Sequence, residues 1–319
     1  MKILIIYTGG TIGMKQNART GMPETFDFAQ IEEEAPELKK FGFVLDTISF
    51  QPIDSSEATP AFWVRLVTTV ADNYDNYNGF VILHGTDTMA YSASALSFML
   101  QNLAKPVIFT GSQLPIGMLR TDGKENLISA IETAASQTDD GRATVPEVCI
   151  YFQNKLLRGN RTTKSSAEHF NAFNSFNYPP LAEAGIYLKF NRQAIMPYPE
   201  NDRLTVHTRL DTSTAILKIF PGMSQALLES VSKIQGIRSL IIETFGSGNA
   251  PTFPWFIDSI RKIADSGTVV LNITQCLRGE VDPDKYTTGR LLKKAGVVSG
   301  KDITAEAALT KLFYLQGKY

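Results

Sequence analysis

Three short segments of the 319-residue chain combine glycine with threonine hydroxyls, and the last ends in a lysine. They are Thr8-Gly-Gly-Thr-Ile-Gly13, His84-Gly-Thr-Asp-Thr88 and Gly159-Asn-Arg-Thr-Thr-Lys164. A threonine hydroxyl is a weak nucleophile until a neighbouring group takes its proton. Lys164 is a candidate for that group if its surroundings favour the neutral amine. A catalytic interpretation of these threonines therefore requires such a base elsewhere in the chain.

Each segment taken alone also has a structural interpretation. Thr8–Gly13 could be a tight turn after a strand, because glycine permits close backbone approach. Thr86 and Asp87 could cap a helix that starts near Met89. Lys164 could be a solvated surface charge. The residues alone leave these alternatives open.

Other chemistries have less support in the sequence. Thr8–Gly13 fits neither common phosphate-binding glycine pattern. The three histidines are scattered, with no pair at metal-ligand spacing, so we expect no metal site and no histidine-based triad. Both cysteines lie in apolar runs and are interpreted as core residues. They are Cys149 and Cys276.

Charge and composition narrow the class of protein. A net charge of −1 argues against a nucleic-acid or anionic-membrane partner, since phosphates attract a basic surface. The apolar run after Lys2 is too short for a signal peptide, and no stretch approaches the ~20 apolar residues of a membrane span. With only two cysteines, the chain is expected to be cytoplasmic.

Short apolar runs alternate with helical patterns along the chain. The runs predict strands at Ile3–Tyr7, Phe80–Leu83, Val107–Thr110, Val148–Phe152, Ala215–Phe220, Leu240–Thr244 and Val269–Ile273. Most are apolar throughout, as in parallel strands buried on both faces. Helical spacing occurs in two sets, Leu127, Ile131, Ala134 and Ala135, and then Leu227, Val231 and Ile234. The sequence therefore predicts an α/β fold with helices on both sheet faces.

Residues 191–212 contain two prolines and no sustained period, and so predict a linker. We expect a larger parallel-sheet domain over 1–190 and a smaller α/β domain over 213–319. Ligands of open α/β sheets bind at the carboxyl ends of strands. That rule adds Asp54-Ser-Ser-Glu57 to the three hydroxyl-rich segments.

In this order and over this length, the segments resemble the bacterial L-asparaginases of the asparaginase/glutaminase family, with the cytoplasmic type I branch most similar. The resemblance runs from Met1 to about Leu315. It implies hydrolysis of L-asparagine to L-aspartate and ammonia, with no metal or cofactor. Such chemistry requires an activated nucleophile, donors for the developing oxyanion and a proton for the ammonia.

The resemblance also assigns roles to residues. Thr11 is implied as the nucleophile that forms an acyl-enzyme, and Thr86, Asp87 and Lys164 as a second triad that polarises a hydroxyl or a water. Asp87 is implied as the partner of the substrate ammonium, and Ser55 with neighbouring backbone N–H groups as the cradle of its carboxylate. The remaining implied substrate contacts are Gly10, Asp54, Ser56, Thr86 and, on the amide side, Ser112.

The sequence departs from the family pattern in the loop after the first strand. Many members carry a tyrosine there, whereas this chain has Met22 near that place and no tyrosine between Tyr7 and Tyr74. We expect Tyr286 of a neighbouring subunit to supply the missing phenol, or merely to pack at the interface. Asn249 and Glu280 match further contributions across that interface, which implies a homodimer or homotetramer.

A second departure concerns regulation. Some type I enzymes bind asparagine at an allosteric site, and Thr163 and Cys276 match residues of that site. Glu243, however, stands where an arginine clamps the effector carboxylate. A carboxylate there would repel the effector, so we expect no such regulation.

Two alternative functions remain. One is the amidotransferase subunit that releases ammonia from glutamine or asparagine, whose members carry an extra N-terminal domain, whereas the first predicted strand here begins at Ile3. The other is a non-catalytic amino-acid sensor, which has no use for Thr11, Thr86 and Lys164 together. The sequence does not predict the preference between asparagine and glutamine.

Overall fold

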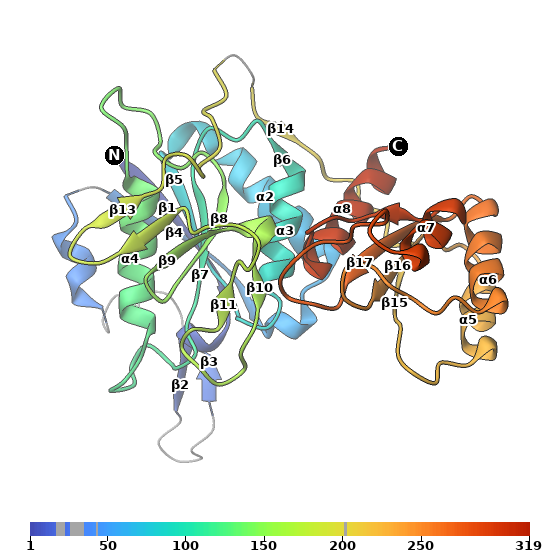
Figure 1. The fold of residues 1–319 in the computed structure, drawn as a ribbon. Coiled ribbons are helices and arrows are strands. Elements are labelled where there is room, and N and C mark those ends of the chain that lie inside the picture. Colours follow the sequence, from blue (N-terminus) through green and yellow to red (C-terminus); the bar gives the residue numbers. More distant parts are fainter. Residues whose placement is uncertain (17–22, 26–34, 43, 201–202) are drawn as a thin grey trace. The chain divides into compact units, whose positions relative to one another are not determined.

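The computed structural model describes residues 1–16, 23–25, 35–42, 44–200 and 203–319. These residues form two compact units, Met1–Thr208 and Arg209–Tyr319, each with its own sheet and helices (Figure 1). The division falls within 191–212, whose role as a linker stays a prediction.

The described part of the first unit is built on one eight-stranded sheet in the order β13-β12-β9-β8-β7-β5-β1-β4. In chain order these strands are β1 (Lys2–Gly9), β4 (Val44–Ile53), β5 (Gly79–Leu83), β7 (Val107–Thr110), β8 (Val148–Phe152), β9 (Lys155–Arg158), β12 (Ala182–Ala184) and β13 (Leu188–Phe190). The covering helices are α2 (Pro60–Asp72), α3 (Met89–Met99) and α4 (Gly123–Ala135). The predicted α/β class is confirmed.

Short strands complete the first unit as two-stranded antiparallel pairs. They are β2 (Met14–Gln16) with β3 (Pro23–Thr25), β6 (Leu100–Gln101) with β14 (Thr205–Val206), and β10 (Thr163–Lys164) with β11 (Phe173–Asn174). The β10–β11 pair contains Lys164, which pairs with Phe173.

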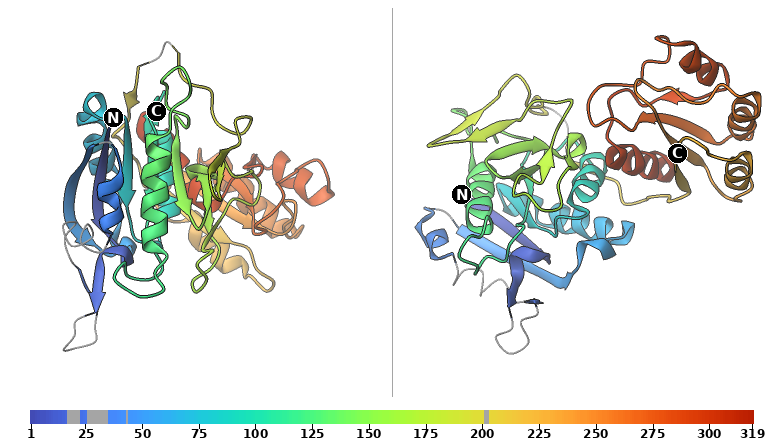
Figure 2. Two further views of the ribbon diagram at one scale, coloured as in Figure 1. Left: turned by 90° about the vertical axis from the view of Figure 1, so that its left-hand side faces the viewer. Right: turned by 60° about the horizontal axis from the view of Figure 1, so that its bottom comes forward.

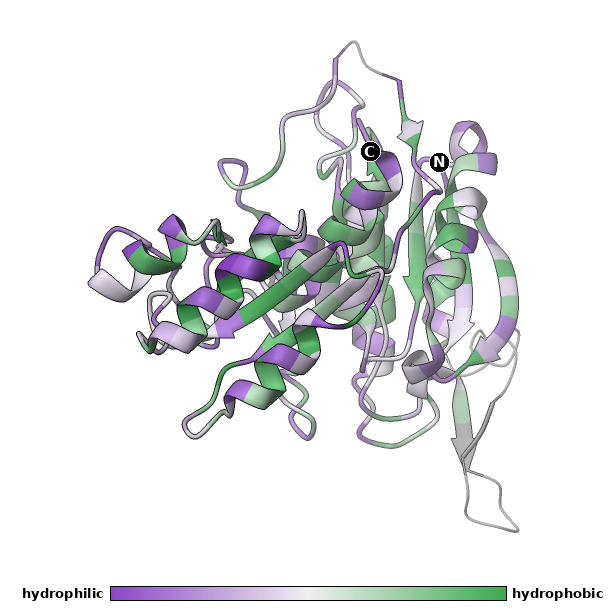
Figure 3. Cartoon of the chain, turned by 90° about the vertical axis from the view of Figure 1, so that its right-hand side faces the viewer, coloured by the Kyte–Doolittle hydropathy of each residue, from purple (hydrophilic) through white to green (hydrophobic). Residues whose placement is uncertain are grey.

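Burial on both faces explains why the central strands are apolar throughout. Every residue of β5 is buried, and hydrophobic stretches lie along several strands (Figure 3). On one face Ile3, Ile5 and Tyr7 of β1 pack in the cluster that includes α4, through Leu127 and Ile131. Helices α2 and α3 cover the opposite face (Figure 2). Burying such strands removes a large apolar surface from water, which is the main force that assembles the sheet.

The sheet is mixed, whereas the sequence predicted a parallel one. Strands β4, β1, β5, β7 and β8 are parallel, but β9, β12 and β13 are antiparallel to their neighbours. The change of direction occurs at Gln153 and Asn154, which have φ values of 41° and 63°. Two residues with positive φ make a tight hairpin, and so short a loop can join only antiparallel strands.

The described part of the second unit contains a four-stranded parallel sheet in the order β15-β16-β17-β18. Its strands are β15 (Thr214–Lys218), β16 (Ser239–Thr244), β17 (Val269–Thr274) and β18 (Val298–Ser299). Its helices are α5 (Gln225–Ser232), α6 (Pro254–Asp265), α7 (Thr287–Lys294) and α8 (Ala305–Lys318). Leu240 and Ile242 pack in the cluster with α5, α6 and α7, whereas Ile241 packs with α8. Helices therefore cover both faces, as predicted.

Two expectations about packing are wrong. Helix α5 ends at Ser232 and buries Leu228. Of the predicted apolar face, Val231 packs against the core cluster, whereas Leu227 and Ile234 are 39% and 54% exposed. The reason is that Leu228, not Leu227, meets the core cluster of the small sheet. Cys276 is exposed because it follows the end of β17, although Cys149 is a core residue as expected.

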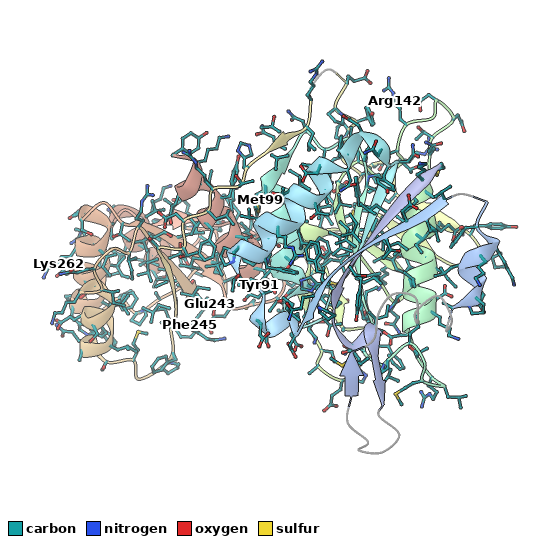
Figure 4. All side chains as sticks on the ribbon, turned by 180° about the vertical axis from the view of Figure 1, so that it is seen from behind. Tyr91, Met99, Arg142, Glu243, Phe245 and Lys262 are labelled. Atoms are coloured by element: carbon teal, nitrogen blue, oxygen red, sulfur yellow. The ribbon has the colours of Figure 1, made fainter. Side chains whose placement is uncertain are left out.

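Met99 is fully buried at the end of α3 and belongs to the packing (Figure 4). None of the helices in the described ranges is both long and apolar enough to cross a membrane.

Candidate active site

Four polar segments meet at one edge of the large sheet. Strands β4, β1, β5 and β7 are parallel neighbours, so their carboxyl ends lie side by side. Directly after them come Asp54–Ser56, Gly10–Thr11, His84–Asp87 and Gly111–Gln113. The sheet therefore gathers segments that lie up to about a hundred residues apart in the sequence.

Glycines let these segments touch. At Gly10, φ is 86°, and a Cβ there would lie 2.5 Å from the Cα of Gly85. A Cβ on Gly85 would in turn lie 2.7 Å from the Oγ of Ser55. A side chain at Gly10 would clash with the Gly85 backbone, and a side chain at Gly85 would clash with the Ser55 side chain. Glycine is thus required to bring the segments of Thr11, Thr86 and Ser55 into contact.

Thr11 starts a 3₁₀ turn, Thr11–Gly13, and is partly buried. The turn is closed by Gly13, whose N–H donates to the Gly10 carbonyl, and Tyr7 donates its hydroxyl to the Gly13 carbonyl at 3.3 Å. Among the residues with described positions, the Thr11 hydroxyl has no hydrogen-bond partner. The tight-turn interpretation is therefore correct, and the turn presents an accessible hydroxyl.

Lys164 contacts both side chains of the Thr86–Asp87 pair. Its Nζ donates to Thr86 Oγ1 at 2.9 Å and to Asp87 Oδ1 at 2.6 Å. The Lys164 side chain is only 17% exposed, so it is not a solvated surface charge. Asp87 is 66% exposed, which leaves its carboxylate open to a further cation. Thr86 itself is 7% exposed.

The helix-capping alternative is wrong for Thr86 and Asp87. Helix α3 begins at Met89 with Thr88 at the capping position and no side-chain cap. The Thr88 hydroxyl instead donates to the Ser55 carbonyl at 2.6 Å, which ties the two segments together. Thr86 and Asp87 are therefore free of the helix end.

The Asp54–Ser56 segment forms its own turn. The Asp54 carboxylate accepts the Ser56 N–H at 2.8 Å, and hydrogen bonds from Ser56 lower the pKa of Asp54. Ser55, at the first position of the turn, is 4% exposed beside Gly85. Asp54 therefore shapes this segment.

The loop after β7 contains Ser112, which was predicted, and Gln113, which sequence reasoning missed. Ser112 donates its hydroxyl to the Leu114 carbonyl at 2.5 Å. Gln113 Oε1 accepts from Thr86 Oγ1 at 3.2 Å. Gln113 could have been found from the sequence, because ligands bind at the carboxyl ends of strands and Gln113 follows Gly111 and Ser112 at the end of β7.

His84 was also missed. It is fully buried, and desolvation lowers its pKa from 6.5 to about 4, so the ring is neutral at neutral pH. Its Nδ1 lies 2.7 Å from the Gly85 carbonyl, which requires a proton on Nδ1. Its Nε2 then accepts from the Ser92 hydroxyl at 2.9 Å, and Ser92 accepts from Trp63 Nε1. This chain anchors the peptide that precedes Thr86 to α2 and α3.

The second unit holds the residues predicted to act from a neighbouring subunit. Asn249 accepts a hydrogen bond from Thr288, Glu280 is exposed, and Tyr286 is 48% exposed just before α7. That these residues contribute to the site around Thr11 of a neighbouring subunit stays a prediction.

Residues matched to the allosteric site lie in both units. Thr163 is half-buried on β10, and Cys276 is exposed. Glu243, marked in Figure 4, faces Lys218 of the neighbouring strand with 4.0 Å between Nζ and Oε2. The expected absence of regulation stays a prediction, as does the loop substitution at Met22, which lies outside the described residues.

Within the described ranges, no group of three histidine, cysteine or acidic side chains could hold a metal ion. The arrangement at the sheet edge consists of hydroxyls, the Gln113 amide, one lysine and the exposed carboxylates of Asp54 and Asp87. Such a set can bind an amino acid through its ammonium and carboxylate, and can activate an oxygen nucleophile.

Two family models cover nearly all of the chain. The model described as "Asparaginase, N-terminal" matches residues 2–196, and "Glutaminase/Asparaginase C-terminal domain" matches residues 214–319. L-asparaginase 1 of Escherichia coli (strain K12) is 43% identical over 98% of this chain and 91% of its own length.

Solved structures agree. L-asparaginase I from Vibrio cholerae superimposes with a TM-score of 0.89 at 40% identity, over 99% of this chain and 93% of its own. The thermostable L-asparaginase from Thermococcus kodakarensis gives 0.90 at 32% identity, over 100% and 94%. On the strength of both domain matches and these relatives, the chain belongs to the asparaginase family.

Proposed function

We propose that the chain is an L-asparagine amidohydrolase that releases L-aspartate and ammonia. The observation that carries this proposal is the contact of Lys164 Nζ with both Thr86 Oγ1 and Asp87 Oδ1, at a strand edge where Gly10 brings the Thr11 segment against Gly85. The high-coverage similarity to L-asparaginase 1 of E. coli supports the choice of substrate.

In this proposal Thr11 attacks the side-chain amide carbon of asparagine. The Thr11 hydroxyl loses its proton, the C–N bond breaks, and ammonia leaves with a proton, so that an acyl-enzyme ester remains. Water then attacks the ester, which releases aspartate and restores the hydroxyl. Lys164 holds and polarises Thr86 for the proton transfers, because its ammonium donates directly to Thr86 Oγ1.

Substrate recognition follows from the charges at the edge. The exposed Asp87 carboxylate would receive the α-ammonium, and the buried Ser55 hydroxyl with nearby N–H groups would receive the α-carboxylate. Gly10, Asp54, Ser56 and Ser112 would provide the remaining substrate contacts, with Asp54 acting through the Ser56 N–H. No cofactor has a role in this scheme.

The proposal includes a cytoplasmic homodimer or homotetramer in which Asn249, Glu280 and Tyr286 complete the site of a neighbouring subunit. The exposed Cys276 thiol is compatible with a reducing compartment.

The test measures ammonia release from L-asparagine, D-asparagine and L-glutamine by the purified chain. We expect turnover of L-asparagine, at least ~10³-fold lower turnover in Thr11→Ala, and normal turnover in the control Thr68→Ala, an exposed threonine on α2. Full activity of Thr11→Ala would exclude the mechanism. Binding of asparagine without ammonia release would indicate a sensor, and ammonia transfer to an acylated tRNA an amidotransferase subunit.

A further inference from the structure

Gln113 lies between Thr86 and the segment that follows Lys164. Its side-chain Oε1 accepts from Thr86 Oγ1 at 3.2 Å. Its Nε2 donates to two backbone carbonyls, of Ala167 at 3.3 Å and of His169 at 3.2 Å. One amide thus touches the hydroxyl of the site and the loop that begins at its lysine.

The two carbonyls fix which way the amide points. A carbonyl oxygen only accepts, so it must face the –NH₂ group of Gln113. If the amide were flipped, Oε1 would face the oxygens of Ala167 and His169, and three acceptors would meet without a proton. The oxygen of Gln113 must therefore face Thr86.

This orientation also fixes the proton of Thr86. Because Gln113 Oε1 has no proton to give, the Thr86 hydroxyl must donate to it. The lone pairs of Thr86 Oγ1 then remain for Lys164, which donates at 2.9 Å. The order of donors runs from Lys164 through Thr86 to Gln113.

The backbone of Gln113 is itself held firmly. Its N–H lies 3.0 Å from both carboxylate oxygens of Asp122, which also accept from the Leu114 N–H and from Asn126 Nδ2. Asn126 further donates to the Gly111 carbonyl at 3.0 Å. The loop after β7 is therefore anchored to the start of α4, so Gln113 offers Thr86 a fixed acceptor.

We propose that Gln113 is a positioning residue of the reaction, which holds the Thr86 hydroxyl in one orientation and ties it to the segment after Lys164. This inference rests on the proposed function. Without Gln113 the hydroxyl can rotate about its C–O bond and the 165–169 segment loses two anchors. Lys164 and Thr86 then spend less time in contact, which lowers the rate of the chemical steps while substrate binding is kept.

The experiment compares Gln113→Met, Gln113→Glu and the control Gln101→Met in the full chain. Methionine keeps the length of the side chain and removes all three hydrogen bonds. Gln101 is exposed and contacts His207, away from the strand edge. Each variant is measured for kcat and KM with L-asparagine across pH, and for its thermal midpoint at the same pH values.

We expect kcat of Gln113→Met to fall by about 10²-fold, the scale of a small misplacement of a catalytic group. KM and the thermal midpoint should change little, and Gln101→Met should match the unchanged chain.

Gln113→Glu provides a further readout. Protonated glutamic acid can still donate to one carbonyl, whereas its carboxylate repels both. Its kcat relative to the unchanged chain should therefore recover as pH falls toward the ordinary glutamic acid pKa of about 4.3.

Unchanged kcat in Gln113→Met would overturn the inference, and so would a parallel loss of kcat and thermal midpoint, which indicates support of the fold alone. A pH-independent ratio for Gln113→Glu would also count against it. If the unchanged chain releases no ammonia, it is the proposed function that fails, and the two failures are therefore distinguishable.

Discussion

Two ion pairs of the first unit have the same length and opposite surroundings. Lys164 and Asp87 lie 2.6 Å apart, as do Arg158 and Glu147, and the two cations are only six residues apart in the chain. In the second pair the side chains are 14% and 4% exposed. In the Lys164–Asp87 pair, the lysine is 17% exposed but the aspartate is 66% exposed.

The Arg158–Glu147 pair is satisfied within the protein. Both carboxylate oxygens of Glu147 accept from Arg158, and one also accepts the Met196 N–H at 2.8 Å. Arg158 donates to the Ala194 carbonyl and lies over the Tyr178 ring. With its partners complete, this pair holds the chain that follows β13.

The difference separates a structural pair from one suited to function. At Asp87 the pair is left open to solvent, so a substrate ammonium can approach a carboxylate that is already oriented by Lys164. Charge and distance are equal in the two pairs. What differs is whether any acceptor is left for a ligand.

The largest expected effect comes from breaking the Lys164–Asp87 pair, which we call the open pair because Asp87 is exposed. Lys164→Met should lower kcat for asparagine by at least ~10³-fold, because Thr86 loses the cation that polarises it. Arg158→Met should retain kcat in the molecules that remain folded. Steady-state ammonia release, corrected for the folded fraction, measures both. Equal losses of kcat in the two variants would contradict the assignment of the open pair to catalysis.

Breaking the buried Arg158–Glu147 pair, the closed pair, should lower the stability of the fold. Glu147→Gln leaves Arg158 buried without its anion and should lower the free energy of unfolding by about 3–5 kcal/mol. Asp87→Asn, in the exposed partner, should change it by less than about 1 kcal/mol. Urea denaturation measures both. The control is Glu200→Gln, which breaks the exposed contact with Arg142 and should have little effect. If Asp87→Asn destabilises as much as Glu147→Gln, exposure is not the deciding difference.

A smaller effect on kcat is expected from Tyr286, and it would show whether a second subunit assists the site that contains the open pair. Tyr286→Phe removes the phenol expected from a neighbouring subunit, and one general acid–base contact is worth on the order of 10²-fold in kcat. The oligomer must be shown to remain intact, by light scattering. Normal turnover would mean that Tyr286 only packs at the interface and that the site works without a phenol.

The smallest effect concerns a third acidic group, Glu243. Because this carboxylate would repel an effector carboxylate, the rate should depend hyperbolically on asparagine concentration. A regulatory coupling of 1–3 kcal/mol would instead produce visible sigmoidicity. Initial rates over a wide range of asparagine concentrations decide this. Sigmoidal kinetics that disappear in Thr163→Ala would show the prediction to be wrong.

Much of the fold was predictable because buried parallel strands are apolar throughout. The bounds of β7 and β8 were predicted correctly. Strand β4 was missed because it lies at the sheet edge, where partial exposure allows a mixed sequence. The antiparallel β9, β12 and β13 are short, and local patterns do not reveal their direction.

The chemistry of the candidate site was fixed by residue types and their order along the chain. Thr11, Thr86, Asp87 and Lys164 stand in motifs whose glycines and hydroxyls are visible without coordinates. Only the tertiary structure decided which of these groups meet, since a contact between residues 77 or 78 positions apart depends on how β5 and the β10–β11 pair are placed. It also decided that Gln113 and His84 belong to the site, because a hydrogen bond depends on distance and direction, which residue type alone does not carry.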